Sequence, residues 1–119
     1  MKRQAHPFKE GGHMMVTQAK LIHALNNQIR LAILENLQAG PKNVTQLVNA
    51  VGASQSNVSQ HLACLRDCGL IQQTRQGKFY YYKLTNHEIM TLLTQMSRVI
   101  DSLNWQEETT QVACPSHMP

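Results

Sequence analysis

Two cysteines four residues apart are the most chemically informative feature of this 119-residue sequence. Cys64 and Cys68 fall in the segment from Ser56 to Leu70, which the residue pattern predicts to be one helix ending at Gly69. On a helix, residues at this spacing share one face with Cβ atoms roughly 5–6 Å apart, whereas a disulfide brings its Cβ atoms to about 3.8 Å. The pair therefore suits a bridging soft metal ion better than a disulfide, because thiolates prefer such ions.

Other roles for the cysteines stay open on the residues alone. Free cysteine is among the most buried residue types and often packs as a small hydrophobic side chain. A redox or sulfide sensor would need a reversible disulfide, most simply between Cys114 and either Cys64 or Cys68. A thiol oxidoreductase is disfavoured, since such enzymes carry Cys-x-x-Cys at a helix start, where the thiol pKa is lowered. We expect a protein that is not an enzyme.

The cysteine-bearing helix follows three other predicted helices. Apolar residues recur at helical spacing from Thr17 to Leu37, with Asn26-Asn27 as a break between two helices. Asn43 is expected to cap a third, short helix, and a turn at Gly52 precedes the cysteine-bearing helix. Two short helices joined by a glycine-containing turn predict a helix-turn-helix.

A β-hairpin and a final helix complete the predicted elements. Residues 70–75 and 78–84 flank a turn at Gln76-Gly77, and the second run is rich in aromatic residues typical of strands. The helix expected over residues 86–103 carries an apolar stripe wide enough for both the core and a partner helix. With the first helix, this stripe predicts a dimer interface at Leu21, Leu92, Met96, Val99, Ile100 and Leu103.

Composition and charge limit the class of protein. The net charge of +4 with only 15% charged residues suggests an anionic partner without resembling a polybasic tail. No apolar run approaches the roughly 18 residues of a membrane span, and no secretory signal is seen. We expect no membrane association and a cytoplasmic setting that keeps thiols reduced. One domain over residues 16–104 is predicted, with a flexible arm over residues 1–15 and a flexible tail over residues 105–119.

Polar side chains at the start of the cysteine-bearing helix could read DNA. They can donate and accept hydrogen bonds at base edges, and the candidates are Gln55, Ser56, Asn57, Ser59 and Gln60, together with His61. Arg75 and Lys78 straddle the hairpin tip, where phosphates would lie. The alternative is a solvated helix face and a solvated hairpin tip.

Several motifs occur in the order and at the separations found in one known family. These motifs are Gln55-Ser56-Asn57-Val58-Ser59-Gln60-His61-Leu62, Leu65-Arg66, Gly69-Leu70-Ile71, Arg75-Gln76-Gly77-Lys78 and Tyr81-Tyr82-Lys83-Leu84. Over residues 16–103 the chain resembles the ArsR/SmtB family of winged-helix metal-responsive repressors. The resemblance implies a mainly α-helical, dimeric winged helix-turn-helix with a β-hairpin wing, and double-stranded operator DNA as the partner.

Within this family, the cysteine positions are similar to those of the CmtR branch, which senses cadmium and lead through three thiolates. The resemblance implies Cys64, Cys68 and Cys114 as ligands, with Cd(II) or Pb(II) as effector and Zn(II) or Hg(II) admitted by the ligand type. It implies a homodimer that binds its operator when metal-free. His61 is a weaker ligand candidate, because a histidine in the middle of such a helix more often contacts DNA or packs against the preceding helix. His117 is another, because the single Cys-x-x-His pair that it forms with Cys114 completes no zinc site.

The sequence departs from the other branches of the family. A Cys-x-Cys site at the start of the third helix would need cysteines where Asn43 and Thr45 stand. A zinc site along the last helix has only His87 available, with Arg98 about where a second histidine would be needed. The N-terminal arm lacks the accessory cysteine of the CmtR branch, which puts a second metal site in doubt.

Overall fold

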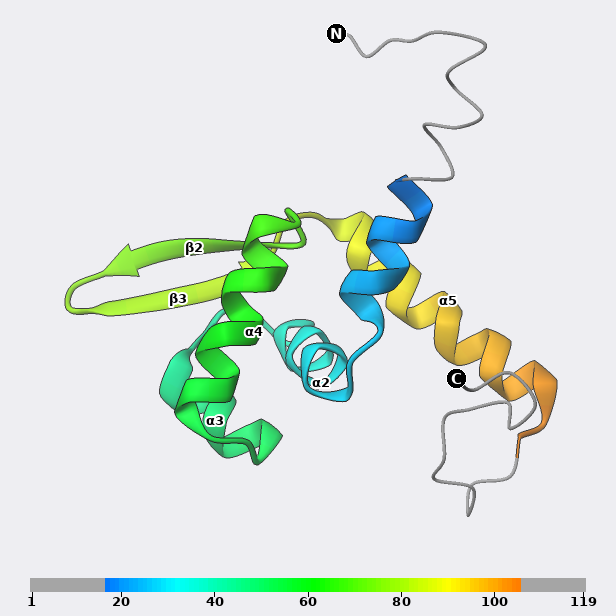
Figure 1. Ribbon diagram of the computed structural model, residues 1–119, viewed down its shortest axis with the longest axis horizontal. Coiled ribbons are helices and arrows are strands. Elements are labelled where there is room, and N and C mark those ends of the chain that lie inside the picture. Colours follow the sequence, from blue (N-terminus) through cyan, green and yellow to red (C-terminus); the bar gives the residue numbers. More distant parts are fainter. Residues whose placement is uncertain (1–16, 106–119) are drawn as a thin grey trace, which may run out of the picture.

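The computed structural model of the protein describes residues 17–105, and its elements follow the predicted order (Figure 1). A helix over residues 17–25 comes first. It is followed by α2 (Gln28–Leu37), β1 (Lys42–Asn43), α3 (Val44–Val51), α4 (Gln55–Asp67), β2 (Ile71–Gln76), β3 (Phe79–Leu84) and α5 (His87–Leu103). The predicted arm and almost all of the predicted tail, including Cys114 and His117, lie outside the described residues.

Helix starts are set by capping side chains, as the sequence predicts for α3. The Asn43 side chain accepts from the backbone N–H of Gln46 at 2.9 Å, and the Gln46 side chain accepts from the N–H of Asn43 at 2.9 Å. The side chains of Asn27, Ser54 and Asn86 each accept from the backbone N–H three residues on and so cap α2, α4 and α5. Each cap satisfies backbone N–H groups that have no partner within the helix.

The sheet is antiparallel with strand order β1-β3-β2. β2 and β3 pair from Ile71 with Leu84 to Gln76 with Phe79, so the turn lies at Gly77-Lys78. The predicted turn at Gln76-Gly77 is therefore one residue early. Gly77 has φ +66°, a left-handed conformation that favours glycine. The two-residue strand β1, which pairs with Tyr81 and Tyr82, was not predicted, because two residues show no alternation.

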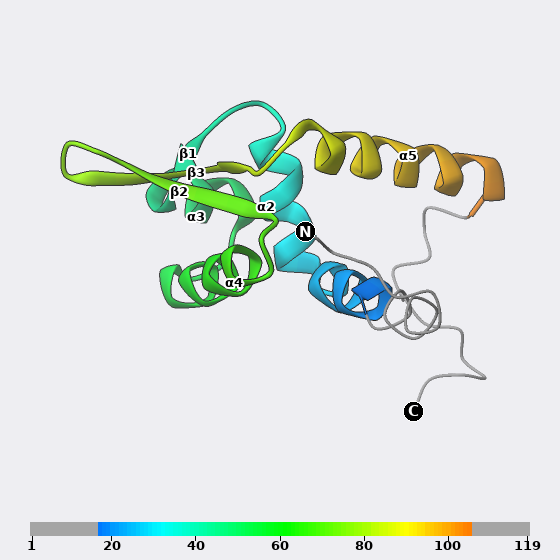
Figure 2. The same cartoon turned by 90° about the horizontal axis from the view of Figure 1, so that it is seen from above.

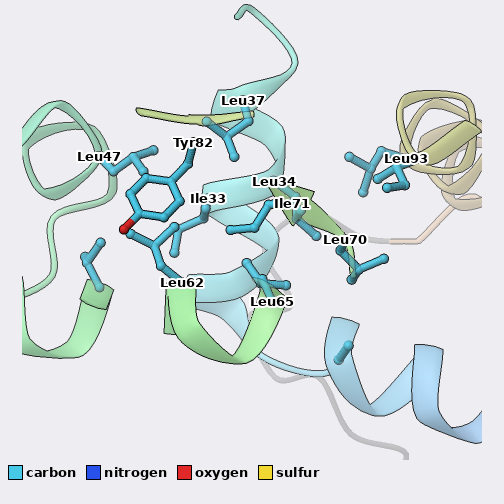
Figure 3. Close-up of a cluster of buried hydrophobic side chains, with 13 residues drawn as sticks. Ile33, Leu34, Leu37, Leu47, Leu62, Leu65, Leu70, Ile71, Tyr82 and Leu93 are labelled. Atoms are coloured by element: carbon cyan, nitrogen blue, oxygen red, sulfur yellow. The ribbon is translucent and has the colours of Figure 1, made fainter. Parts of the chain in front are cut away.

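The core lies between α2, α3, α4 and the sheet. Ile33 and Leu34 of α2 are fully buried, and Leu62 and Leu65 of α4 pack beside them (Figure 3). The β2–β3 hairpin and α5 extend from this core in opposite directions, and the helix over residues 17–25 lies on the same side as α5 (Figure 2). Within residues 17–105, none of the helices combines the length and the apolar character that a membrane span requires.

Candidate functional site

The outer face of α4 carries the predicted DNA-reading residues. Val58, Leu62 and Leu65 are buried and hold one side of α4 against the core. The polar residues on the other faces are all exposed, namely Gln55, Ser56, Asn57, Ser59 and Gln60. Their side chains project from the first turns of a helix anchored by the Ser54 cap, whose Oγ accepts from the Asn57 N–H at 3.1 Å. This placement leaves them free to contact bases.

The hairpin presents two of its cations at its tip. Arg75 and Lys78 are both exposed. The Nε of Arg75 donates to the carbonyl of Gly77 at 2.9 Å, and its guanidinium lies 5.8 Å from the ring centroid of Tyr80. These contacts restrain the arginine, and cation–π contacts at exposed sites are worth about 0.5–1 kcal/mol. The Arg75 side chain is therefore partly preorganised at the hairpin tip, where the prediction places DNA phosphates.

A hydrogen-bonded chain ties this hairpin to α4. Arg66 donates to the Gln73 side-chain oxygen at 2.7 Å, and the Gln73 amide donates to the Tyr82 hydroxyl at 3.1 Å. Tyr82 is buried, whereas Tyr80 and Phe79 on the same strand are exposed. Within the tyrosine run, Tyr82 therefore packs in the core, whereas Tyr80 forms part of the solvent-facing surface of the hairpin.

The two cysteines of α4 are free thiols and half-buried. Cys68 is the C-cap of the helix, and its N–H donates to the carbonyl of Cys64 at 3.0 Å. Burial raises the pKa of the Cys68 thiol, and the charge and hydrogen bond of the neighbouring Cys64 raise it further. Lys20 and Arg30 act in the opposite direction. The two thiols therefore interact electrostatically, and the positive charges of Lys20 and Arg30 also act on Cys68.

The described residues supply only part of the predicted metal site. Cys64 and Cys68 are brought together, but no group of three or more His, Cys, Asp or Glu side chains suitable for a metal occurs within residues 17–105. A soft divalent ion at the thiol pair would need a further donor. The predicted donor, Cys114, lies outside the described residues.

His61 faces the interior as well as the surface. It is half-buried, and its Nδ1 lies 3.2 Å from an Arg30 guanidinium nitrogen. Arginine can only donate, so Nδ1 accepts and Nε2 carries the proton. Burial, followed by the charge of Arg30, lowers the pKa of His61. A metal ion at Nδ1 would displace this hydrogen bond, which supports the expectation that His61 is a weaker ligand candidate than the cysteines.

Arg30 is a buried residue that was not predicted from the sequence. Its side chain also bonds the last carbonyls of the helix over residues 17–25, at Ala24 and His23. A signal was present: Arg30 precedes Leu34 and Leu37 by four and seven residues, so a cation stands on the apolar stripe of α2. Such a cation must find internal acceptors.

The predicted dimer residues fall into two groups. Leu21, Leu92 and Met96 are half-buried, and Leu21 and Met96 pack against the core within this chain. Val99, Ile100 and Leu103 are 46%, 44% and 51% exposed at the far end of α5. Ile22 and Trp105, each 65% exposed, are further apolar residues that were not predicted to lie at the surface.

Comparisons with known proteins identify a family. Residues 27–73 match the family described as bacterial regulatory protein, arsR family. The transcriptional regulator CmtR of Mycobacterium tuberculosis is 37% identical over 82 residues, which cover 69% of this chain and 70% of that protein. A probable mercury resistance operon repressor of Streptomyces lividans is 34% identical over 77 residues, covering 65% of this chain and 62% of that protein.

The solved structures agree with the fold. The homodimeric winged helix-turn-helix DNA-binding domain Mb0332 of Mycobacterium bovis superposes with a TM-score of 0.75 at 25% identity, covering 95% of this chain and 100% of that one. The predicted fold class, mainly α-helical with a hairpin wing, is confirmed: α3 and α4 form the helix-turn-helix, and β2–β3 form the wing.

Proposed function

The chain belongs to the ArsR family of bacterial transcriptional regulators, and from this premise we propose that it is a metal-responsive repressor. Proteins of this kind bind DNA and are not enzymes. The proposed repressor binds operator DNA as a homodimer when metal-free and leaves it when a soft heavy metal binds. Cd(II) or Pb(II) fits an all-sulfur site best, and Zn(II) and Hg(II) are also compatible with thiolate ligands.

The observation that carries this proposal is the position of the thiol pair on the DNA-reading helix. Cys64 and Cys68 interact with each other on α4, the same helix whose first turns expose the polar residues from Gln55 to Gln60. A ligand held by these thiols is therefore attached to the element that reads DNA. Because two sulfurs under-coordinate a soft ion, the proposal adds Cys114 as third thiolate.

Release of DNA requires that metal bind the free form more tightly than the DNA-bound form. Such a coupling is typically about 1–3 kcal/mol, or 5–150-fold in affinity. In the proposed mechanism, Cys114 joins Cys64 and Cys68 and so links the C-terminal segment to α4. The link changes the orientation of α4 relative to its counterpart in the dimer.

The test is a titration with Cd(II) or Pb(II) in which thiolate charge-transfer absorption and DNA anisotropy are followed together. Cys64→Ser and Cys68→Ser should abolish metal-induced release and leave metal-free DNA binding intact, because serine preserves the helix and lacks the soft donor. Ala63→Ser is the matched control, since it adds a serine beside Cys64 without removing a thiol. Its response should equal that of the wild type.

Cys114→Ser is the decisive variant. The proposal expects weaker metal binding and loss of release. Full cadmium-induced release in this variant would show that Cys114 is no ligand and that the three-thiolate site is wrong at its third residue.

A thiol-based redox or sulfide response on the same fold is the second candidate. It is favoured by the electrostatic influence of Cys64 on Cys68, which, after burial, raises the pKa of the Cys68 thiol. Their helical spacing opposes a direct disulfide, so the reversible bond would join one of them to Cys114. Mass spectrometry after mild oxidation decides: loss of two hydrogens together with loss of DNA binding would favour this candidate.

A further inference from the structure

Arg30 joins three parts of the molecule through one buried guanidinium. It is 8% exposed and is the one buried charged side chain among the described residues. Its Nε donates to the Ala24 carbonyl at 2.6 Å, and one terminal nitrogen donates to the His23 carbonyl at 2.9 Å. The other terminal nitrogen donates to Nδ1 of His61 at 3.2 Å. The helix over residues 17–25, α2 and α4 thus meet at one side chain.

The chemistry of these acceptors makes the arrangement specific. Ala24 and His23 lie in the last turn of their helix, where carbonyls lack partners within the helix and carry the negative end of its dipole. Their bonds to a guanidinium are charge-assisted. The rigid, planar guanidinium fixes the directions of its donors, whereas a lysine ammonium would supply only a point charge. The His61 ring is therefore held at a set position relative to the end of the helix over residues 17–25.

We propose that Arg30 is a positioning residue that sets the angle between the helix over residues 17–25 and the DNA-reading helix α4 through its hydrogen bond to His61. Arg66 near the end of α4 bonds Gln73 of the hairpin, but α4 is held to the core itself by apolar contacts of Val58, Leu62 and Leu65, which have no preferred direction. The directional bond to His61 lies in the middle of α4. The inference depends on DNA reading by α4 and does not depend on the response to metal.

The test compares two substitutions of His61 in the full chain without metal. In His61→Asn, the side-chain oxygen can accept the Arg30 hydrogen bond from nearly the position of Nδ1. In His61→Leu, the bulk is kept and the acceptor is lost. Residual dipolar couplings of the backbone amides in residues 17–25 and in α4 measure the angle between these helices. DNA affinity is measured with a duplex that the wild-type protein selects from random sequences.

The expected result is a changed helix angle and about tenfold or more weaker DNA binding in His61→Leu, in line with loss of a hydrogen bond to a charged group. His61→Asn should restore both quantities to within about threefold of wild type, whereas a side chain that only packs would not be rescued by asparagine. In the wild type, nitrogen NMR should show the His61 ring protonated at Nε2 alone.

Three outcomes would overturn the inference. Unchanged dipolar couplings in His61→Leu would show that the bond does not set the angle. Equal losses of DNA affinity in both variants with unchanged couplings would mean that His61 contacts DNA directly. Protonation of the wild-type ring at Nδ1 would exclude the bond itself. If His61→Leu does not fold, Arg30→Lys replaces it, and wild-type couplings in that variant would count against the proposal.

Discussion

At the scale of single residues, the site combines a neutral histidine, a buried cation and two thiols within one region. His61 can accept from Arg30 only while Nδ1 is unprotonated. Protonation would remove the acceptor and place a second positive charge beside the first. The pKa of His61 is lowered for these reasons, by burial and by Arg30.

This lowered pKa predicts a specific loss of stability in mild acid. As pH falls below the ordinary histidine value of 6.5, the unfolded chain takes up a proton at His61 before the folded chain does. The free energy of unfolding therefore decreases with falling pH until the folded-state pKa is passed. Calorimetry from pH 8 to pH 5 measures the slope. His61→Asn should have a smaller slope, and equal slopes in the two proteins would contradict the prediction.

The raised pKa of Cys68 predicts proton release on metal binding. Its thiol is held protonated by burial and by Cys64, and it must lose this proton to become a ligand. Metal affinity should therefore fall as pH falls, and binding should release protons at neutral pH. Calorimetric titration in buffers of different ionisation enthalpy counts them. Cys68→Ser should release fewer protons than Ala63→Ser, and equal release would show that Cys68 is not a ligand.

At the scale of elements, the wing is the part whose contribution to DNA binding can be separated from that of α4. Arg75 and Lys78 sit on either side of Gly77 at the tip of the hairpin. They lie outside α4, so their charge can be altered without changing the residues that are predicted to read bases.

Arg75→Ala or Lys78→Ala should weaken binding to all duplexes alike. Each lost phosphate contact should reduce the slope of log affinity against log salt concentration by about one. Gln72→Ala, an exposed polar position on the same hairpin, is the control. A Gln60→Ala variant should instead change sequence preference, by about 1–3 kcal/mol if a good base contact is lost. Wild-type salt slopes in both wing variants would exclude phosphate contacts by the wing.

The helices were predictable from the sequence because their starts are encoded locally. Asn43 and Asn86 cap helices by bonds to residues three positions on, so composition and spacing reveal them. β1 could not be predicted, since its two residues are strand only through pairing with Tyr81 and Tyr82. The proximity of Cys64 and Cys68 was likewise predictable, because it follows from their spacing on one helix. The contact of Arg30 with His61 was not, because it spans 31 positions and depends on tertiary packing.

At the scale of the whole molecule, α5 has more apolar surface than the core of this chain buries. Ile89 and Leu93 are buried against the core near the start of the helix. Val99, Ile100 and Leu103 near its end remain about half exposed. The exposed Ile22 on the neighbouring helix belongs to the same apolar surface. We predict that a second copy of the chain covers this surface.

Val99→Lys should dissociate the predicted dimer and weaken operator binding. A buried ammonium without a partner is strongly disfavoured, and a monomer loses the paired helices that match half-sites about 34–36 Å apart. Thr94→Lys adds the same charge on an exposed polar part of α5 and should leave both properties unchanged. Sedimentation velocity at micromolar protein measures the dimer. A wild-type protein that sediments as a monomer would disprove the predicted interface.

The small strand β1 has a consequence for the time course of folding. The hairpin closes through a two-residue turn, but β1 pairs Lys42 with Tyr82, forty positions along the chain. Closing so long a loop is entropically costly before any contact offsets it, so local structure forms sooner. β1 is therefore expected to dock late, after the hairpin exists. Since Asn43 belongs to β1 and also caps α3, the helix-turn-helix acquires its final fit to the wing only in that last step.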